Sequence, residues 1–253
     1  MLLTRVMPCL LLRQGSLVKT MRFKDPSYIG DPTNAIRTYN EKEVDELILL
    51  DISATVEKRP PSFAAIEMFA SECFMPVAYG GGLKKVEDVK EVFRLGIEKV
   101  VINSAAVERP EFIRELSSRF GAQAVVASID AKRRPGGGHQ VFIHGGRTAT
   151  GLDPRALAVQ MMETGVGEIF LNSIDQDGTM EGYDLELIKI VTSAVDVPVI
   201  ACGGAGRLED FRKAIKEGGA SAVAAGSMVI YFGRNRAILI NFPTKRELAK
   251  LFN

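Results

Sequence analysis

Residues 76–104 read PVAYGGGLKKVEDVKEVFRLGIEKVVINS, and residues 198–227 read PVIACGGAGRLEDFRKAIKEGGASAVAAGS. The two segments align with one extra residue near Gly218. Each runs from an apolar stretch through a glycine-containing turn and a helical pattern to a second apolar stretch. Short apolar runs that alternate with helical patterns are typical of βαβ units with parallel strands. The segments therefore predict one βαβ unit that occurs twice in the chain.

The duplication extends toward the amino terminus. Residues 45–52 (DELILLDI) align with 167–174 (GEIFLNSI), and residues 6–13 (VMPCLLLR) align with 125–132 (VVASIDAK). In the second alignment Leu11 takes the position of Asp130. Two halves of four βα units each follow, about residues 1–122 and 123–253. A two-fold repeat favours a closed barrel over a doubly wound sheet, so we predict a single α/β domain, residues 1–253, with the (β/α)8 TIM-barrel fold.

Apolar runs rich in β-branched residues give the eight expected strands, as in sheets buried on both faces. They are residues 4–12, 46–52, 76–79, 99–103, 124–129, 168–172, 198–201 and 222–225. Helical periodicity predicts helices over residues 86–95, 110–120, 155–164, 185–193 and 208–216. In such barrels the active site lies at the carboxyl ends of the strands. We therefore look for functional residues directly after the apolar runs.

The composition narrows the function classes. The chain is 46% hydrophobic and 25% charged, which excludes disordered and collagen-like proteins, and a formal net charge of +1 gives no reason to expect nucleic acid or a membrane as partner. Cys9, Cys73 and Cys202 have no disulfide or metal-site spacing, so we expect a reducing cytoplasm and no bound metal. Arg5 interrupts the apolar N-terminal run, and no export or anchoring segment is expected.

Two glycine-containing turns occupy equivalent places in the two halves. Gly80 to Gly82 follow the third strand, and Gly203 to Gly206 follow the seventh, with Ala205 among them; the next strands end at Asn103–Ser104 and Gly226–Ser227. Glycine allows close approach of the backbone to an anion, and N–H groups at a helix N-terminus bind phosphate. The pair predicts a ligand with two phosphates. The alternative is that the glycines only shape the βα turns.

Carboxylates at strand ends are candidate acids and bases: Asp51, Asp130, Asp175 and Asp177. Asp130 ends the buried run VVASID, where desolvation raises a carboxyl pKa toward neutrality. Its alternative role is to cap a turn or to pair with Lys132. Asp177, in DQDGT, either faces the ligand or forms an Asx turn before Gly178.

Two basic stretches lack clear periodicity. Residues 15–32, GSLVKTMRFKDPSYIGDP, predict a long functional loop, such as a lid in which Lys19 covers a phosphate; a solvated basic loop is the alternative. Residues 133–139 predict a flexible extension of the fifth strand in the form of a hairpin. The two histidines, His139 and His144, lack further metal ligands and receive no role.

Several words of this sequence together resemble the HisF family, the cyclase subunit of imidazole glycerol phosphate synthase, from Arg5 to about Val229. They are DPTNAIRTYNEKEVDELILLDI, ATVEKR, VAYGGG, KVVINSAAVERP, AVVASIDAKR, TGLDP, GVGEIFLNSIDQDGT, GYDLELI and IACGGAG. The resemblance implies a barrel that binds a HisH glutaminase and conducts its ammonia through the barrel centre to a phosphorylated ligand, without a cofactor. It implies an ammonia gate at Arg5, Glu46, Lys99 and Glu168, phosphate sites at Gly82, Asn103, Ser104, Gly204, Gly226 and Ser227, and a lid lysine at Lys19.

The chain departs from the family pattern at a catalytic position. In the family two aspartates, ending strands one and five, move protons; Asp130 matches the second, but Leu11 replaces the first. Leucine cannot move a proton, and losing a positioned general acid or base costs about 100- to 10,000-fold in rate. Gly145 and Asn172 stand where the family usually has Ser and Thr. The tail, residues 231–252, is also unlike an ordinary cyclase ending.

A HisF-like subgroup, encoded with surface-polysaccharide or nonulosonic-acid genes, resembles the chain in MPCLLLRQGSLVKTMRFKDP (7–26) and RAILINFP (236–243). This resemblance implies a barrel that delivers ammonia to an ATP-dependent amidotransferase, which converts a sugar acetamido group to acetamidino. That is the favoured hypothesis. The alternatives are an imidazole glycerol phosphate synthase lyase of histidine biosynthesis, and a stand-alone phosphate-binding barrel with isomerase-like or structural function. The apolar AILINF run is either core or a surface for docking a partner.

Overall fold

The structure is a computed structural model that describes residues 4–233 and 235–252. The first three residues of the apolar N-terminal run, Arg234 of the tail and the last residue of the predicted domain lie outside the described residues. Among the described helices, none is long and apolar enough to cross a membrane.

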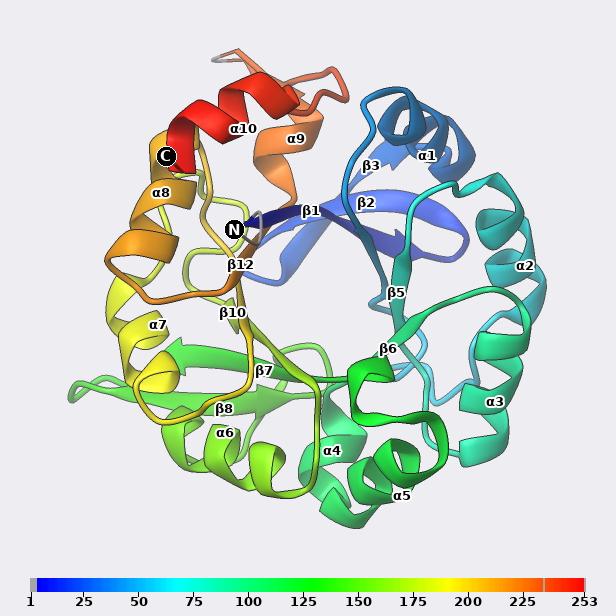
Figure 1. Cartoon of the computed structure of the whole chain (residues 1–253), viewed down its shortest axis with the longest axis vertical. Coiled ribbons are helices and arrows are strands. Elements are labelled where there is room, and N and C mark those ends of the chain that lie inside the picture. Colours follow the sequence, from blue (N-terminus) through cyan, green and yellow to red (C-terminus); the bar gives the residue numbers. More distant parts are fainter. Residues whose placement is uncertain (1–3, 234, 253) are drawn as a thin grey trace.

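Eight parallel strands of the described chain form a closed barrel (Figure 1). They are β1 (Arg5–Arg13), β4 (Leu47–Asp51), β5 (Val77–Gly80), β6 (Lys99–Ile102), β7 (Val125–Arg133), β10 (Glu168–Ser173), β11 (Val199–Cys202) and β12 (Ala222–Ala225). Each of these strands pairs with the one that follows it in this series, and the pairing of β12 with β1 closes the barrel. The predicted (β/α)8 fold is confirmed.

Helices surround the barrel, and the five predicted helices agree with the structure to within one residue at each end. The described helices are α1 (Pro32–Glu41), α2 (Phe63–Glu72), α3 (Val86–Arg94), α4 (Ser104–Glu108), α5 (Pro110–Phe120), α6 (Pro154–Glu163), α7 (Leu185–Thr192), α8 (Leu208–Lys216), α9 (Ser227–Ile230) and α10 (Lys245–Phe252), with a 3₁₀ turn at Ala122–Ala124. In α3 the buried Val86, Val89 and Val92 form one face, and acidic residues in the first turn and Arg94 in the last complement the helix dipole.

The strands separate two apolar cores because their side chains alternate between two faces. One core lies between the barrel and the helices and contains large side chains such as Tyr39, Phe69 and Phe211. The other fills the barrel interior with Met7, Leu11, Ile48, Val101, Val126, Phe170, Ile200 and the small side chains of Ala78, Ala222 and Ala224. Apolar side chains therefore pack the middle of the barrel interior.

The backbone repeats between the two halves where the sequence does. Gly81 and Gly203 have φ angles of 124° and 91°, and Gly82 and Gly204 have 74° and 110°, all in the region that favours glycine. Asn103 and Gly226, which precede α4 and α9, have nearly the same conformation, with φ of −109° and −108°. The two halves thus build the same turn twice, in agreement with the predicted half-barrel repeat.

The prediction of an irregular loop over residues 15–32 is wrong. Strands β2 (Ser16–Met21) and β3 (Lys24–Gly30) form an antiparallel hairpin that pairs with the end of β1. Its apolar residues Leu17 and Val18 are adjacent in sequence and contact different cores, so no helix-like or strictly alternating pattern marks the strand. The hairpin turn places Arg22 and Phe23 at positive φ without glycine, which hides it from sequence analysis.

The extension after the fifth strand is a hairpin, as predicted. Strand β8 (His139–Ile143) pairs antiparallel with the end of β7, and β9 (Thr148–Ala149) pairs with β8. The buried Nε2 of His139 lies 3.0 Å from Oδ2 of Asp184, and Asp184 also accepts the N–H of Leu187 at the start of α7. His139 therefore ties the hairpin to a helix.

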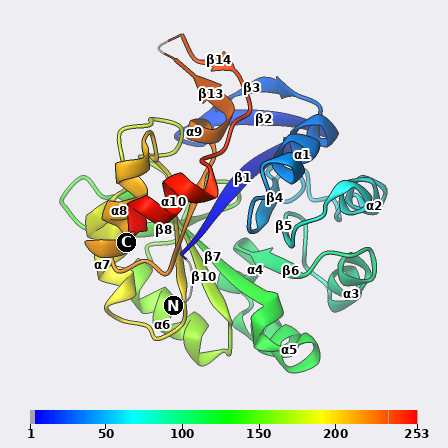
Figure 2. The same ribbon diagram turned by 45° about the horizontal axis from the view of Figure 1, so that its top comes forward.

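The tail adds a third, separate hairpin. Strands β13 (Tyr231–Phe232) and β14 (Ala237–Ile238) pair only with each other in the described chain and project from the molecule (Figure 2). Farther along, Phe242 is buried edge-on against Tyr39, with ring centroids 6.4 Å apart. The AILINF run is therefore divided: its last residue joins the core, whereas Ile238 and Leu239 are exposed.

We expect Asp184→Ala to lower the free energy of unfolding by about 2–4 kcal/mol, because it removes the cap of α7 and leaves the buried His139 without a partner. Chemical denaturation measures the loss. Arg133 binds both Asp184 and Glu186. Glu186→Ala is therefore the matched control, because Glu186 binds Arg133 at the exposed surface, and we expect a change below about 0.5 kcal/mol. Equal losses in the two variants would contradict this role for Asp184.

Candidate functional site

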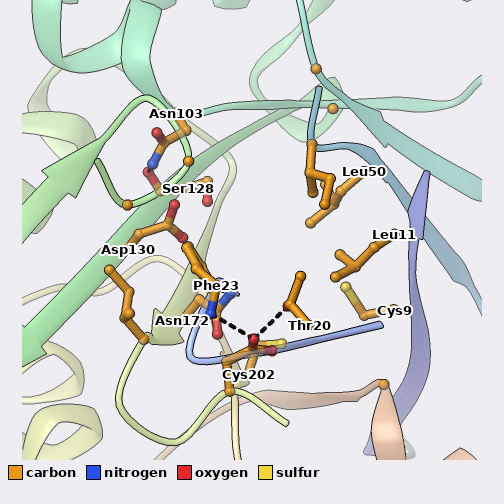
Figure 3. Close-up of a pocket in the computed structure, with 18 of the residues that line it drawn as sticks. Cys9, Leu11, Thr20, Phe23, Leu50, Asn103, Ser128, Asp130, Asn172 and Cys202 are labelled. Carbon is orange, nitrogen blue, oxygen red and sulfur yellow. Dashed lines mark hydrogen bonds between the residues drawn. The ribbon is translucent and has the colours of Figure 1, made fainter. Parts of the chain in front are cut away.

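A cavity of about 760 Å³ opens at the carboxyl ends of the strands. Its lining combines polar strand-end residues with the two glycine turns and the β2–β3 hairpin. In Figure 3, Leu11 and Leu50 lie on one side of the cavity and face Asp130 on the other, while Thr20 and Phe23 of the hairpin lie at its edge. The structure therefore brings the predicted phosphate residues and three of the four candidate acids and bases into one cavity; Asp175 does not line it.

The first glycine turn is tied to its surroundings by side chains. The N–H of Gly82 donates to Oγ1 of Thr55 at 3.3 Å. The hydroxyl of Ser104 accepts the N–H of His144 and donates to Oδ1 of Asn103, whose amide nitrogen donates to a carbonyl of β7. These bonds fix the turn and engage the N–H of Gly82, and phosphate binding here stays a prediction.

The second glycine turn is more open to a ligand. A Cβ on Gly204 would collide with the carbonyl of Gly182, so only glycine fits there. At Gly226, Nζ of Lys19 occupies the place where a Cβ would lie. Lys19 reaches this turn from β2, within the hairpin. The Ser227 hydroxyl is buried and has no hydrogen-bond partner among the described residues. A lysine beside an unpaired hydroxyl is the kind of site that an anionic group satisfies.

Asp130 has an unusual environment for a carboxyl group. Burial, with a smaller contribution from the Asp177 carboxylate, raises its pKa from 3.8 to about 7. Asn172 lies opposite Asp130 in the β7–β10 ladder, and Oδ1 of its amide is buried without a partner in the described chain. Near neutral pH, Asp130 can therefore both give and take a proton.

The wall opposite Asp130 is apolar. Leu11 and Leu50 are paired on adjacent strands β1 and β4, and both pack with Val18 and Ile48 in the interior core. Leu11 is only 8% exposed. The half-barrel equivalent of Asp130 is thus a buried hydrocarbon side chain, with no second carboxyl group at that position.

The other predicted carboxylates are engaged within the protein. Asp177 accepts both the Thr20 hydroxyl at 2.6 Å and the N–H of Phe23 at 3.1 Å on the same oxygen. Asp175 accepts the N–H of Arg133. These bonds hold the two hairpins against the barrel mouth, and direct contact of Asp177 with a ligand stays a prediction.

Asp51 also has a structural partner that was not singled out in the sequence. Its carboxylate accepts two bonds from the guanidinium of Arg59, at 2.7 and 3.0 Å, and also binds Ser53. These bonds engage both oxygens of the carboxylate within the protein. Asp51 therefore shapes the turn after β4.

At the other end of the barrel, the four predicted gate residues meet in a closed ring of alternating charge. Arg5 contacts Glu46 and Glu168, each at 2.7 Å, and Nζ of Lys99 contacts the same two carboxylates at 2.8 and 3.3 Å. Burial by itself lowers the pKa of Arg5, but the carboxylates of Glu168 and Glu46 outweigh it and raise the pKa. The charges close the amino end of the apolar interior.

The sequence as a whole matches the family described as histidine biosynthesis protein over residues 5–235. The chain belongs to this family. It is 50% identical to a relative from Pseudomonas aeruginosa, over 96% of the chain and 97% of the relative, whose provisional name is imidazole glycerol phosphate synthase subunit hisF2. A relative from Leptospira interrogans is 46% identical over the full length of both, and one from Vibrio vulnificus is 42% identical over 99% of the chain and 96% of the relative. Their provisional names are imidazole glycerol phosphate synthase subunits HisF and hisF3.

In this histidine biosynthesis family member, sequence analysis missed three residues that organise the site. Thr20 and Phe23 bind Asp177 from 157 and 154 positions away, and Arg59 neutralises Asp51. No local pattern links residues so far apart in sequence. Arg59 ends the segment ATVEKR, only eight positions after Asp51. This short separation was the one sequence signal for the ion pair.

Asp130→Asn tests the buried carboxyl of this family member. Between pH 4 and 7 the native state keeps a proton that the unfolded chain loses, so the stability of the wild-type protein falls as pH rises through this window. Asparagine removes this dependence. We expect Asp130→Asn to gain stability relative to wild type as pH rises from 4 to 7, by about 2–4 kcal/mol, with no further gain above pH 8.

Urea denaturation at several pH values measures this difference. Ser128→Ala is the matched control, because Ser128 is buried on the same strand and does not titrate in this range. Its difference from wild type should stay constant with pH. A constant difference for Asp130→Asn as well would show that Asp130 has an ordinary pKa.

Proposed function

We propose that this chain is a HisF-like synthase subunit that receives ammonia from a HisH-type glutaminase and passes it through the barrel. The acceptor that we propose is a surface-polysaccharide sugar, whose acetamido group becomes acetamidino. The observation that carries the proposal is the combination of an intact charged ring at one end of the barrel with Leu11 in place of a proton-transfer group at the other. The entrance for ammonia is complete, whereas half of the cyclase chemistry is missing.

The closed ring supports a glutaminase partner. Removing one member would leave an uncompensated charge at a mostly buried position, which is strongly destabilising. A stand-alone isomerase has no use for four charges that close the amino end of its barrel, so the ring argues against that alternative. The names of the relatives, as subunits of a synthase, agree with a partner subunit.

The interior supports the passage of ammonia. Ammonia is small and uncharged and can cross an apolar passage, whereas the ammonium ion would lose its hydration there at high cost. Between the ring and the polar residues of the mouth, the interior core consists of apolar side chains, and the small alanines on β5 and β12 take up little space. Near the mouth, a hydrogen bond with Cys9 together with burial raises the pKa of the Cys202 thiol, which therefore stays neutral.

Chemistry at the acceptor belongs, in this proposal, to a separate ATP-dependent amidotransferase. An amide oxygen is a poor leaving group, so ATP must first transfer a phosphoryl or adenylyl group to it. Ammonia then adds to the carbon, the oxygen leaves with the transferred group, and an amidine forms. Leu11 cannot move a proton, and in the proposed complex the barrel does not need a proton-transfer group at this position.

A cyclase of histidine biosynthesis is the second candidate. Asp130 favours it, because a carboxyl group with a pKa of about 7 is suited to general acid–base catalysis at neutral pH. The two glycine turns also keep the arrangement expected for a ligand with two phosphates. On this alternative another group would take the place of Leu11.

A cyclase assay with saturating ammonium and the phosphoribulosyl substrate of histidine biosynthesis separates the two candidates. We expect no turnover by the wild-type chain and measurable turnover by Leu11→Asp, because a second positioned carboxylate contributes about 100- to 10,000-fold in rate. Leu50→Asp is the matched control: it places a carboxylate on the neighbouring strand and should stay inactive. Wild-type turnover within about tenfold of a working cyclase would contradict the proposal.

The partner at the ring is tested by mixing the chain with the HisH-type glutaminase from the same genome. We expect a stable complex in which glutaminase turnover rises by about tenfold or more. The double variant Lys99→Met/Glu168→Gln removes one charge of each sign, so it should fold but lose much of this stimulation. Absence of complex formation by the wild-type chain would overturn the proposed function.

A further inference from the structure

Exposed large apolar side chains gather on the two hairpins at the mouth end of the barrel. We call them the mouth patch, which consists of Met21, Tyr28, Phe232, Ile238 and Leu239. Their exposed fractions range from 43% for Met21 to 68% for Tyr28. Both hairpins project from the carboxyl end of the barrel (Figure 2), where Arg236 of the tail hairpin also donates to the carbonyl of Thr179 after β10. Exposed apolar side chains that are concentrated at one end of a molecule are typical of interaction sites.

The tail hairpin cannot owe its stability to its own contacts alone. Strands β13 and β14 pair over only two residues each, Tyr231 with Ile238 and Phe232 with Ala237. An isolated two-stranded hairpin is marginally stable in water. Here Phe232 and Ile238 remain 62% and 50% exposed, although burying such side chains is the main source of stability for a hairpin. The hairpin is therefore built to be covered.

The charge around the mouth patch indicates what covers it. Residues 231–240 contain two arginines and no carboxylate, and the β2–β3 hairpin carries Lys19, Arg22 and Lys24 against Asp25 alone. Within the described chain, neither Arg22, Lys24 nor Arg236 forms an ion pair. A complementary surface is acidic around an apolar groove. The ring end of the barrel, by contrast, has balanced its own charges.

We propose that the mouth patch is the docking surface for the ammonia-accepting enzyme. That enzyme presents an apolar groove to the β13–β14 hairpin and carboxylates to Arg22, Lys24 and Arg236, which we call the rim cations. This inference rests on the proposed function. Ammonia that left the open mouth would be protonated in water and would no longer be a nucleophile. The acceptor site must therefore seal the mouth directly, and the mouth patch is the apolar surface next to the exit. The β13–β14 hairpin fits this role, because its exposed apolar side chains are free to contact a partner.

The partner is identified by photocrosslinking in the organism that encodes the chain, with a photoreactive amino acid at position 238 and, as control, at Phe74. Phe74 is 87% exposed but lies just before β5, at the ring end. Crosslinking only names the protein. The captured protein is then purified and combined with the chain, the glutaminase, ATP and its sugar substrate for the decisive measurement.

That measurement uses glutamine labelled with ¹⁵N in the amide and an excess of unlabelled ammonium in solution. With the wild-type chain we expect the product nitrogen to come from glutamine. Phe232→Ser/Ile238→Ser should weaken acceptor binding by about 10- to 100-fold and shift the product nitrogen toward the unlabelled pool, without changing glutaminase stimulation. Met68→Ser, at a similarly exposed position on α2, is the matched control and should leave the labelling unchanged.

Added salt provides an independent check, because binding through rim cations and partner carboxylates should weaken as ionic strength rises. The inference is overturned if the double variant retains the ¹⁵N labelling of wild type, if position 238 crosslinks only to the glutaminase or to a second copy of this chain, or if the wild-type chain binds vesicles of anionic phospholipid and the variant does not. Failure of the proposed function has a different signature, since the wild-type chain would then not stimulate the glutaminase at all.

Discussion

The four-membered ring of Arg5, Glu46, Lys99 and Glu168 depends on the whole barrel and in turn constrains it. Its members come from four strands or strand starts, and each charge is held by two opposite charges at 2.7–3.3 Å. Only a closed sheet in one register brings them together. Buried ion pairs contribute little net stability compared with apolar packing, although breaking one is costly. On this argument the ring fixes the amino end of the interior at little net gain in stability, which fits the conduit that we propose.

The two halves of the barrel share a backbone and differ in chemistry. Gly82 and Gly204 occupy equivalent turns, yet the hydroxyl of Ser104 is engaged by His144 whereas that of Ser227 is unpaired beside Lys19. Asp130 and Leu11 occupy equivalent strand ends. Duplication thus supplies the scaffold twice, and single side chains make the two copies chemically different. This separation between scaffold and site is expected, because function belongs to sites carried by a fold.

The barrel could be predicted from sequence because buried parallel strands and amphipathic helices leave local patterns, which the repeat shows twice. The site residues at strand ends could be located for the same reason. The β2–β3 hairpin could not, since its turn uses Arg22 and Phe23 at positive φ and its anchor, Asp177, lies more than 150 positions away. The pairing of Asp51 with Arg59 and the exposure of Phe232 also follow from tertiary structure, which residue patterns do not encode.

Leucine at position 11 changes the electrostatics of the mouth as well as the number of groups there that can transfer a proton. Asp130 already has a pKa of about 7 because burial and the nearby Asp177 carboxylate disfavour its ionised form. A second carboxylate on the opposite wall would raise that pKa further, since like charges in a poorly solvated cavity oppose each other's ionisation. Leu11 removes this repulsion and extends the apolar lining of the interior to the cavity itself. In the function that we propose, an uncharged nucleophile must stay unprotonated until it reaches its acceptor, and a drier exit with one fewer ionisable group favours it. The same leucine that would deprive a cyclase of a proton-transfer group would then suit a conduit.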